Sequence, residues 1–313
     1  MIWKDKTILI TGGTGSLGSA LTEHLLLKNI RKLIIFSRDE FKQHEMSKRI
    51  KDERIRFFLG DVRDRNRLER AFRNVDVVIH AAALKQVPAM EYNPTEAVKT
   101  NIDGTVNVIE AAIDSDVDAV VNISSDKAVN PVNLYGATKL TGEKIISAAN
   151  HYAGLGRKRF VSVRYGNVIG SRGSLVEFFD KLIERGIKVL PITDARMTRF
   201  WLTLDQAMCL IEYALEHGNG GEIFVPRLPS MRVVDFITAL YPTMEHEFTG
   251  IRPGEKIHEI LIGEDNANVK WIDLNKMKEL PKIERYTSDG NDWWMSPSEI
   301  QWIVRRRIDD VPL

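Results

Sequence analysis

The stretch Thr11-Gly12-Gly13-Thr14-Gly15-Ser16-Leu17-Gly18 decides the fold of this chain. It stands between an apolar β-rich run, Thr7–Thr11, and an amphipathic helical pattern. Its glycines permit a tight turn, a close backbone approach to a pyrophosphate and close helix packing, while free N–H groups at a helix N-terminus attract anionic oxygen. A flexible turn is the alternative, but the strand–turn–helix position favours dinucleotide binding. The residues expected around the phosphates are Gly12, Gly15, Ser16, Leu17 and Gly18.

Short β-rich runs alternate with amphipathic stretches through the first half of the chain. The β-rich runs are Thr7–Thr11, Lys32–Ser37, Ile55–Gly60, Val75–Ala81, Ala119–Ser124 and Phe160–Arg164. Between them, apolar residues recur at three- and four-residue spacing, for example over Ser19–Lys28, Arg65–Phe72 and Thr95–Ser115. This alternation is typical of parallel βαβ units. We therefore expect an α/β fold with a Rossmann-like, doubly wound parallel sheet.

The regularity weakens after Gly166, where loops such as 170–174 and 251–256 interrupt shorter elements. This change predicts a smaller C-terminal substrate lobe. Because Phe200–His217 again has the pattern of a strand followed by a helix, we expect the two lobes to be interleaved in sequence. The expected division is a nucleotide-binding Rossmann domain over residues 1–166 and a mainly substrate-binding lobe over 167–313, with about 198–220 returning to the Rossmann domain.

The composition is that of an ordinary globular protein. Of the 313 residues, 43% are hydrophobic and 28% are charged. The longest apolar runs are far shorter than the roughly 20 residues that cross a bilayer. The N-terminus lacks the pattern of a signal peptide, and the single cysteine, Cys209, excludes an internal disulfide. We therefore expect a cytoplasmic protein with no membrane partner.

Charge and residue spacing exclude two other kinds of partner. A balance of 44 basic against 43 acidic side chains gives a net charge of +1, which argues against nucleic-acid binding. The cluster Arg305-Arg306-Arg307 is interpreted as a solvated helix face. No spacing of His, Cys and Asp resembles a metal site, and His80 is interpreted as a core residue at a strand end. The aromatic tail, Trp293, Trp294 and Trp302, is expected to pack a C-terminal helix, with an oligomer contact as the alternative.

The end of the second β-rich run bears on the choice of cofactor. NAD enzymes commonly place an acid there, whereas this chain has Phe36-Ser37-Arg38-Asp39-Glu40-Phe41-Lys42-Gln43. Hydroxyl and cationic groups favour a ribose 2′-phosphate through charge-assisted hydrogen bonds, so Ser37, Arg38 and Lys42 predict NADP. The alternative is that Arg38 pairs with Asp39 or Glu40 at the surface. Farther along, Asp61 and Val62 are expected to hold the adenine, and Ala81 leaves room for the ribose and nicotinamide.

A group of reactive side chains follows the fifth β-rich run. Ser124-Ser125-Asp126-Lys127 precedes Tyr135-Gly136-Ala137-Thr138-Lys139, which opens a helix. The spacing of four puts Tyr135 and Lys139 on one helix face, where an ammonium would lower the pKa of the phenol and make it a proton acceptor. Lys139 would also hold the nicotinamide ribose. The spacing alone occurs by chance, and Asp126 with Lys127 fits an ordinary ion pair; together with the glycine loop, the four residues predict an active site.

Longer motifs add a family resemblance. On TGGTGSLG, HAAALK, ISSDKAVNP and YGATK, the chain resembles the extended short-chain dehydrogenase/reductases. It resembles more closely the inverting UDP-N-acetylglucosamine 4,6-dehydratases of the pseudaminic acid pathway, on SRDEFKQ, GDVRD, SSDKAVNPVNLYGATK, VRYGNVIGSRGS, ITDARMTRFW and IRPGEK. These motifs lie between about residues 7 and 260, and the last fifty or so residues carry none of them.

The resemblance implies an NADP-dependent hydro-lyase. Tyr135 would take the proton of the sugar 4-hydroxyl as hydride passes from C4 to NADP+. Lys127 would then remove the C5 proton, Asp126 would protonate the departing 6-hydroxyl, and hydride would return to C6. Reprotonation of C5 from the opposite face, also assigned to Lys127, would invert that centre. The implied product is a UDP-2-acetamido-2,6-dideoxy-L-arabino-hex-4-ulose for bacterial surface glycan or flagellin sugar synthesis.

The resemblance also implies contacts elsewhere. Asn167, Arg199 and Arg252 are assigned to the substrate, Lys85 lies at a matched position near the sugar, and Arg172 is a further cation for the diphosphate. Val168 is counted with the cofactor residues. Taken alone, each arginine is more often a surface residue. Homo-oligomers are common in the family, so an oligomer is expected.

Three other functions stay open. A C5-retaining dehydratase is the nearest of them. A nucleotide-sugar 4-epimerase would use Tyr135 and Lys139 but no acid–base pair at C5 and C6, so Asp126 and Lys127 argue against it. A non-catalytic NADP-binding scaffold would keep the fold, and the intact set of Tyr135, Lys139 and Lys127 argues against that.

Overall fold

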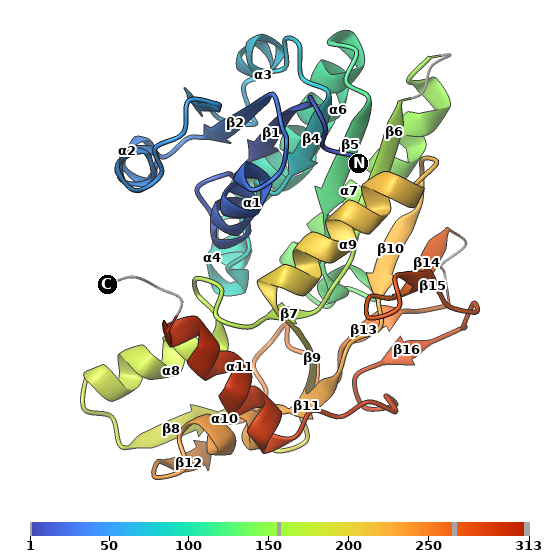
Figure 1. The fold of residues 1–313 in the computed structure, drawn as a ribbon. Coiled ribbons are helices and arrows are strands. Elements are labelled where there is room, and N and C mark those ends of the chain that lie inside the picture. The colour runs from blue at the N-terminus through green and yellow to red at the C-terminus, as the bar shows by residue number, and fades with distance from the viewer. Residues whose placement is uncertain (1, 155–157, 265–267, 310–313) are drawn as a thin grey trace.

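The computed structural model describes residues 2–154, 158–264 and 268–309 and confirms the predicted Rossmann-like α/β fold (Figure 1). Its main sheet has nine strands in the order β15-β14-β10-β6-β5-β4-β1-β2-β3. The neighbours pair in parallel, apart from β14 and β15. The strands are β1 (Thr7–Thr11), β2 (Lys32–Ser37), β3 (Ile55–Leu59), β4 (Val77–His80), β5 (Ala119–Ile123), β6 (Arg159–Val163), β10 (Ile223–Pro226), β14 (Val269–Asp273) and β15 (Lys278–Glu279).

The central strand β1 decides where a ligand can bind. All five of its residues are buried, as expected for a parallel strand that is covered on both faces. It pairs with β2 on one side and β4 on the other, so the strand order reverses here. In doubly wound sheets, a crevice opens at such a switch point beyond the carboxyl ends of the strands. The glycine loop leaves β1 at this crevice.

Helices cover both faces of the sheet (Figure 1). One face carries α1 (Ser16–Leu26), α2 (Glu40–Arg49) and α9 (Leu204–His217). The other carries α3 (Arg65–Ala71), α6 (Gly104–Asp114) and α7 (Leu134–Tyr152), with α4 (Val87–Tyr92) packed on α7. Each face has its own cluster of buried side chains, including Leu210 in one and Leu68 in the other. Burial of one such leucine stabilises the fold by roughly 1.5–3 kcal/mol. Since each core contains many buried side chains, the two cores together hold the sheet, and with it the strand ends that carry the site, in place.

The single helix expected over residues 95–115 is divided. A short α5 (Pro94–Val98) leads into a π-helical turn, Lys99–Asp103, and α6 continues from there. The buried side chain of Asn101 in this turn accepts a hydrogen bond from the Leu84 backbone N–H at 2.8 Å and donates to the Leu84 carbonyl at 2.9 Å. Hydrophobic periodicity does not reveal one extra residue in a turn, and π turns often mark functional sites.

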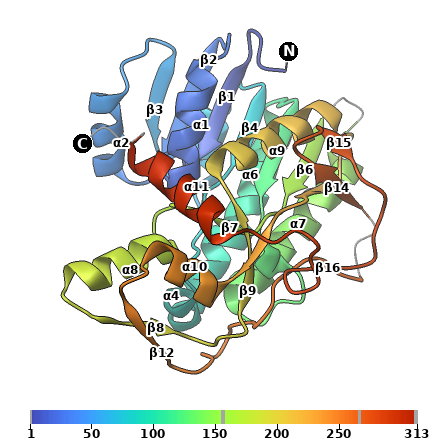
Figure 2. The same cartoon turned by 60° about the horizontal axis from the view of Figure 1, so that its bottom comes forward.

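A smaller lobe lies beyond the carboxyl ends of the sheet (Figures 1 and 2). Its core is a cluster of buried apolar side chains in which the rings of Trp201 and Phe236 stack 4.0 Å apart. Its helices are α8 (Leu175–Glu184), α10 (Val233–Leu240) and α11 (Pro297–Asp309). Its strands form three small sheets: β7 (Asn167–Val168), β9 (Thr198–Leu202) and β11 (Ser230–Arg232); β8 (Val189–Ile192) and β12 (Glu245–Phe248); and β13 (Ile260–Ile262) and β16 (Tyr286–Thr287).

Segments from the second half of the chain contribute both to the main sheet with its helices and to the smaller lobe. Helix α9 packs against β5 and β6 of the main sheet. Strands β10 and β14 also join that sheet, although the return was expected only over 198–220, and β9 belongs to the lobe. Periodicity identifies strands but not their partners, which explains this difference. The domain boundaries stay a prediction.

The C-terminal segment packs on the lobe through α11, where Ile300 is fully buried. Trp294 donates its indole N–H to the Asn291 carbonyl at 2.7 Å. Both Trp294 and Trp302 are partly exposed. The side chains of Arg305-Arg306-Arg307 lie outside the described residues. Within the part of the chain that the structure describes, no helix is both long and apolar enough to span a membrane.

Candidate active site

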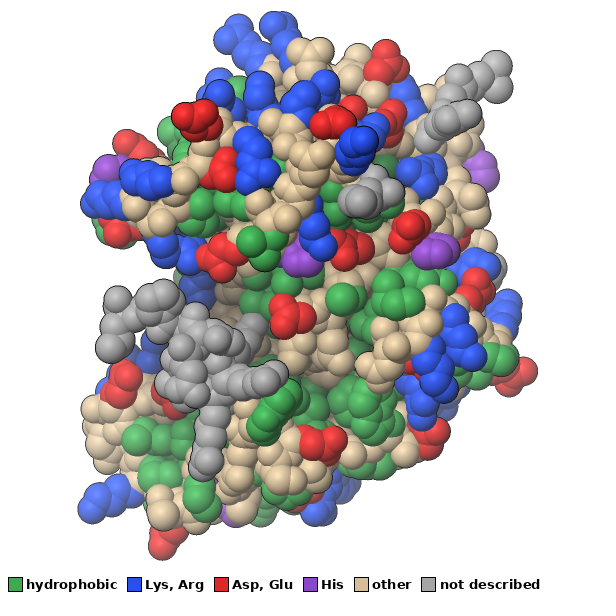
Figure 3. Space-filling view, in the orientation of Figure 1, with side chains coloured by type: hydrophobic (Ala, Val, Ile, Leu, Met, Phe, Trp, Pro, Cys, Tyr) green, Lys and Arg blue, Asp and Glu red, His purple; other side chains and the backbone are tan. Residues whose placement is uncertain are grey.

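A large cleft lies between the main sheet and the lobe. Its volume is about 860 Å³, and Figure 3 shows the surface hollowed between these two parts. All residues predicted to bind the cofactor line it: Gly12, Gly15, Ser16, Leu17, Gly18, Ser37, Arg38, Lys42, Asp61, Val62, Ala81, Tyr135, Lys139 and Val168. It is also lined by Lys127 and by three of the predicted substrate residues, Lys85, Asn167 and Arg172.

The glycine loop has no room for side chains. Gly12 has a φ of +66°, and a Cβ there would lie 2.8 Å from the backbone nitrogen of Ala82. A Cβ on Gly18 would lie 2.5 Å from the Cα of Gly13. Gly15 is the N-cap of α1 and makes no side-chain capping bond. The loop therefore offers bare backbone and a helix N-terminus, which fits the phosphates of a dinucleotide.

A segment of the lobe lies against this loop. The Arg172 backbone N–H donates to Ser16 Oγ at 2.8 Å, and its guanidinium donates to the Thr14 carbonyl. The Arg172 carbonyl in turn accepts from Lys85 Nζ at 2.7 Å. Arg172 thus contacts both the cofactor loop and Lys85, and its predicted role as a substrate anchor stays a prediction.

Two cations lie at the carboxyl end of β2. Arg38 is half exposed and forms a long ion pair with Asp61, 3.8 Å between Nη1 and Oδ2. Lys42 pairs with Asp39 at 2.8 Å. The buried Ser37 hydroxyl is hydrogen-bonded to the glycine loop. The guanidinium of Arg38 is thus held loosely enough to meet an additional anion at the cleft.

His80 has the structural role expected of it. Its Nδ1 lies 2.8 Å from Thr11 Oγ1 and its Nε2 lies 3.1 Å from Thr105 Oγ1. Since the Thr105 hydroxyl donates to the Asn101 carbonyl, it accepts from His80, which places the imidazole proton on Nε2. Burial, followed by the charge of Lys139, lowers the pKa of His80 to about 3. The ring is therefore neutral and ties β1 to α6.

A 3₁₀ turn, η2 (Asp126–Ala128), and the start of α7 form the chemical centre. Asn133 caps α7 by accepting from the Gly136 N–H at 2.8 Å, and its amide donates to the Gly254 carbonyl at 2.7 Å. A Cβ on Gly136 would collide with the Lys127 carbonyl oxygen. Only glycine allows this approach, which brings Tyr135 against η2.

Four polar side chains then lie together. The phenol of Tyr135 lies beside the Ser125 hydroxyl, which works to lower its pKa. Ser125 Oγ donates to Asp126 Oδ1 at 2.8 Å, and Lys127 Nζ donates to the same oxygen at 3.0 Å. Asp126 is fully buried, and its Oδ2 has no hydrogen-bond partner among the described residues. One buried carboxyl group therefore accepts from both the ammonium of Lys127 and the serine beside Tyr135.

Burial and charge act in opposite directions on this pair. Burial raises the pKa of Asp126, although the charge of Lys127 works to lower it. For Lys127, burial works to lower the pKa, but the attraction of Asp126 and Glu259 outweighs burial and raises the pKa. Both shifts favour the protonated form of the group concerned, so the pair holds a proton strongly. Such a pair can exchange a proton along its 3.0 Å hydrogen bond.

Tyr135 and Lys139 differ from the prediction in one respect. Burial raises the pKa of Tyr135, and the charge of Lys127 offsets this only in part. Lys139 donates to the Ile123 carbonyl at 2.7 Å, and its burial lowers its pKa to about 8. The expected lowering of the phenol pKa by Lys139 is therefore wrong for the protein by itself, because desolvation of the phenol is the larger effect.

Two predicted substrate residues do not line the cleft. The Arg199 guanidinium donates to three backbone carbonyls, those of Thr198, Lys256 and Ile257. Arg252 is exposed and pairs with Glu255. Their roles toward a substrate stay predictions.

Three functional candidates were not predicted from the sequence. Glu259 is 3% exposed, and its Oε1 lies 3.5 Å from Lys127 Nζ. Its signal was an acid within the apolar run Ile257–Ile262, directly after the IRPGEK motif. The sequence predicted no role for Ser125, although it donates to Asp126 and lies beside Tyr135. Asn101 was hidden in a helical pattern.

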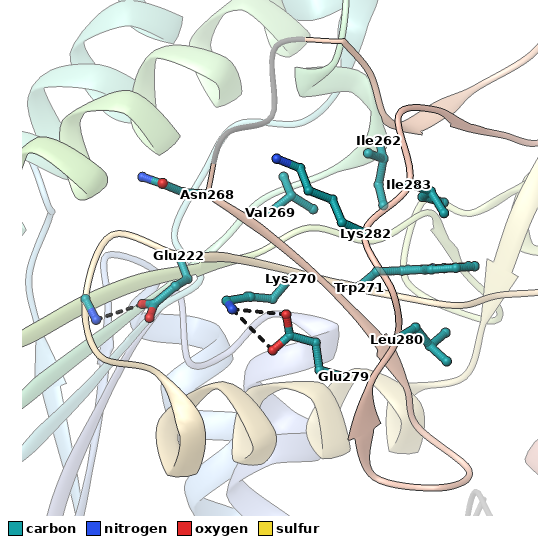
Figure 4. A pocket seen from close by; sticks show the side chains of 11 residues that line it. Glu222, Ile262, Asn268, Val269, Lys270, Trp271, Glu279, Leu280, Lys282 and Ile283 are labelled. Atoms are coloured by element: carbon teal, nitrogen blue, oxygen red, sulfur yellow. Dashed lines mark hydrogen bonds and ion pairs between the residues drawn. The ribbon is translucent and has the colours of Figure 1, made fainter.

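The rest of the described structure offers fewer reactive side chains than the cleft does. A second cavity of about 380 Å³ lies at the edge of the main sheet, where Lys270 pairs with Glu279 at 3.0 Å and Glu222 accepts from the Gly220 N–H (Figure 4). The described residues contain no cluster of His, Cys, Asp or Glu that could hold a metal ion. The larger cleft is thus the candidate active site.

Known proteins are similar to this chain in sequence and fold. The family model described as Polysaccharide biosynthesis protein matches residues 8–280. The chain is 47% identical to UDP-N-acetylglucosamine 4,6-dehydratase (inverting) of Campylobacter jejuni subsp. jejuni serotype O:2, over 97% of this chain and 98% of that protein. It is 40% identical to UDP-glucose 4-epimerase of Rickettsia rickettsii, over 92% of this chain and 84% of that protein.

Solved structures agree with this grouping. Pen from Bacillus thuringiensis has a TM-score of 0.88 and 36% identity, over 98% of this chain and 99% of that one. A dTDP-glucose 4,6-dehydratase from Streptomyces venezuelae, solved with NAD bound, has a TM-score of 0.74 over 96% and 98% of the two chains. At 21% identity, the latter shows the shared fold alone.

Proposed function

Because this chain belongs to the polysaccharide biosynthesis protein family and matches an inverting UDP-N-acetylglucosamine 4,6-dehydratase over nearly its whole length, we propose that it dehydrates UDP-N-acetylglucosamine with inversion at C5. The product is UDP-2-acetamido-2,6-dideoxy-L-arabino-hex-4-ulose. The observation that carries the proposal is the buried Asp126–Lys127 pair, connected through Ser125 to Tyr135. It supplies the acid and base that elimination needs.

The same pair bears on the main alternative. A 4-epimerase oxidises and reduces C4 alone, so it has no use for an acid and a base at C5 and C6. The 40% identity to a UDP-glucose 4-epimerase nevertheless makes this the second candidate function. The two reactions give different products, which a single experiment separates.

The cleft fits a nicotinamide dinucleotide. The bare backbone of Gly12, Gly15 and Gly18 suits its pyrophosphate, and Arg38 with Lys42 favours NADP over NAD. When bound, such a cofactor supplies a hydride acceptor and then a hydride donor, so the overall reaction is redox-neutral. Operation in the pseudaminic acid pathway and assembly as a homo-oligomer belong to the same proposal.

The side chains account for the proton movements. Tyr135 accepts the proton of the 4-hydroxyl and must be a phenolate for this step, the form that burial disfavours and the charge of Lys127 favours. Once C4 is a ketone, C5 becomes acidic. A proton then passes from Lys127 Nζ to Asp126 Oδ1, which turns the ion pair into an amine and a carboxylic acid. The amine takes the C5 proton, and the acid protonates the 6-hydroxyl, which leaves as water.

The proton count closes through Ser125. After elimination, Lys127 is an ammonium and Asp126 a carboxylate. Lys127 returns a proton to C5, and inversion follows if this proton arrives on the opposite face. The proton held by Tyr135 then passes through Ser125 to Asp126, which restores the starting charges. The hydrogen bonds of Ser125 and Lys127 to Asp126, and the place of Tyr135 beside Ser125, support this route.

Product analysis by NMR in deuterated water tests the proposed function. Purified protein, supplied with UDP-N-acetylglucosamine and catalytic NADP, should form a 4-keto-6-deoxy sugar with deuterium at C5 and L-arabino configuration. A D-xylo product would replace the inverting assignment with retention. A UDP-N-acetylgalactosamine product would identify an epimerase, and unchanged substrate would exclude dehydration.

Replacement of Arg38 tests the cofactor preference. Arg38→Ala removes a charge-assisted hydrogen bond to the 2′-phosphate, worth about 1.5–3 kcal/mol, so the Kd for NADP should rise roughly 10–100-fold. The Kd for NAD should change little. Isothermal titration on cofactor-free protein measures both. Arg49→Ala, which removes an exposed arginine of α2 paired with Glu23, is the matched control. Equal losses for both cofactors would refute recognition of the phosphate by Arg38.

A further inference from the structure

Glu259 is a buried carboxylate that the mechanism above does not use. It directly precedes β13, which packs against η2. Its side chain is almost completely buried, and its backbone N–H donates to Ser288 Oγ at 2.9 Å. Burial of an ionised carboxylate is costly unless partners compensate its charge. The surroundings of Glu259 therefore need to explain why an acid stands here.

Three cations from three segments compensate it. Lys127 Nζ of η2 and Arg199 Nε of β9 lie 3.5 and 3.7 Å from Glu259 Oε1. Lys256 Nζ lies 4.0 Å from Oε2. Burial works to raise the pKa of Glu259, but these charges outweigh burial and lower it. Glu259 is therefore ionised.

Lys127 thus contacts two buried carboxyl groups of different character. Asp126 Oδ1, at 3.0 Å, also receives the Ser125 hydroxyl, and its pKa is raised. Glu259 Oε1, at 3.5 Å, belongs to a carboxylate whose pKa is lowered. When an environment pushes the pKa values of two acids apart, the acids take different roles. Asp126 can receive a proton, while Glu259 keeps a fixed negative charge.

Arg199 connects this charge to the chain around it. Its guanidinium holds the carbonyls of residues 198, 256 and 257, and its Nε faces Glu259. Lys256 donates to the Val129 carbonyl at 2.5 Å, which fixes the same segment to the residues after η2. The position of Glu259 relative to Lys127 is therefore defined on both sides.

We propose that Glu259 is a positioning residue for the dehydration: it holds the Lys127 amine in place beside Asp126, and its fixed charge sets the protonation of that pair. The inference rests on the proposed function and adds a residue to it. The charged and titratable groups that face Glu259 or the pair are Lys127, Asp126, Arg199, Lys256 and, from α7, Tyr135.

The inference has a signature in the pH dependence. The active pair holds one shared proton, so the rate falls at low pH when the pair has gained a second proton and at high pH when it has lost the first. The negative charge of Glu259 favours proton binding at both steps. Glu259→Gln removes this charge at constant size and leaves Arg199 and Lys256 uncompensated. Both limbs of the profile should therefore move to lower pH, by roughly 1–3 units.

The experiment compares pH–rate profiles of dehydration for wild type, Glu259→Gln and Glu259→Asp. Glu259→Asp keeps the charge but withdraws it by one methylene, so its profile should move in the same direction by less. It decides the question if Glu259→Gln does not fold. The control is Glu212→Gln in α9, which removes a carboxylate hydrogen-bonded to Trp3 and His24 outside the cleft lining. Its profile should equal that of wild type.

The outcomes separate the two claims. Downward movement of both limbs supports the role of Glu259. A loss of rate that is equal at every pH, with unmoved limbs in the folded variants, overturns it and leaves a structural residue. If wild type forms no 4-keto product, the proposed function fails first, and the inference about Glu259 falls with it.

Discussion

The Lys127→Met variant loses dehydration while it keeps the oxidation of C4. Methionine has nearly the shape of the lysine chain but neither donates nor accepts the proton at C5, so the elimination should slow by roughly 10²–10⁴-fold. Tyr135 and Ser125 remain, so the first step still proceeds, although loss of the Lys127 charge raises the pKa of Tyr135 further and should slow this step to a smaller extent. Reduced nicotinamide should therefore accumulate on mixing with substrate, which stopped-flow absorbance detects, and C5 should take up no deuterium.

The controls for this variant concern charge and stability. Loss of the ammonium leaves Asp126 and Glu259 buried without their shared cation, a change that typically costs about 3–5 kcal/mol. Thermal unfolding must therefore show that the variant is folded at the assay temperature. Lys48→Met, which removes an exposed lysine of α2 that pairs with Glu45, should retain full activity. Dehydration at the wild-type rate by Lys127→Met would remove this residue from the mechanism.

The Tyr135→Phe variant should fail one step earlier. Without the phenol oxygen, nothing takes the proton of the 4-hydroxyl, so oxidation of C4 should slow by roughly 10²–10⁴-fold. No reduced nicotinamide should appear, and the substrate should persist. When the 4-keto product is supplied instead, C5 should still exchange with deuterated water, because Asp126 and Lys127 are unchanged.

A control variant and one contradicting outcome test the prediction for Tyr135→Phe. Tyr152→Phe, in the last turn of the same helix and exposed, should behave as wild type. Accumulation of reduced nicotinamide by Tyr135→Phe at the normal rate would show that another group accepts the proton. Together, the two variants separate the steps of the reaction: Tyr135→Phe slows the step that forms the ketone, and Lys127→Met slows the elimination that follows it.

Local patterns were sufficient to predict six of the nine strands of the main sheet and the cofactor loop. The strands of a parallel sheet are buried on both faces and thus appear as short apolar runs, and β1 to β6 lie within a residue or two of those runs. Glycines that a close backbone approach requires, such as Gly12 and Gly18, stand at fixed spacing in one loop. Tyr135 and Lys139 are likewise separated by one helical turn.

The rest depended on contacts between distant parts of the chain. Glu259 meets Lys127 only because β13 packs on η2, and no spacing in the sequence encodes that contact. The direction of the Tyr135 pKa shift could not be predicted without knowing that the phenol is buried, because the effect of burial on the pKa outweighs that of the nearby charges. The contact of Arg172 with the glycine loop and the orientation of Arg199 toward backbone carbonyls are also tertiary facts.

The π turn at Lys99–Asp103 has a consequence for the phase of the helix that contains it. An α-helix rotates by about 100° per residue, so the additional residue accommodated by a wider turn shifts the angular register between α5 and α6. Deletion of one residue there would restore regular winding and rotate one segment relative to the other by about that angle. Asn101 would then no longer face both Leu84 and Thr138. The irregular turn thus sets the rotation between α5 and α6. Because of it, the consecutive helical segments can contact both the core and the rim of the cleft.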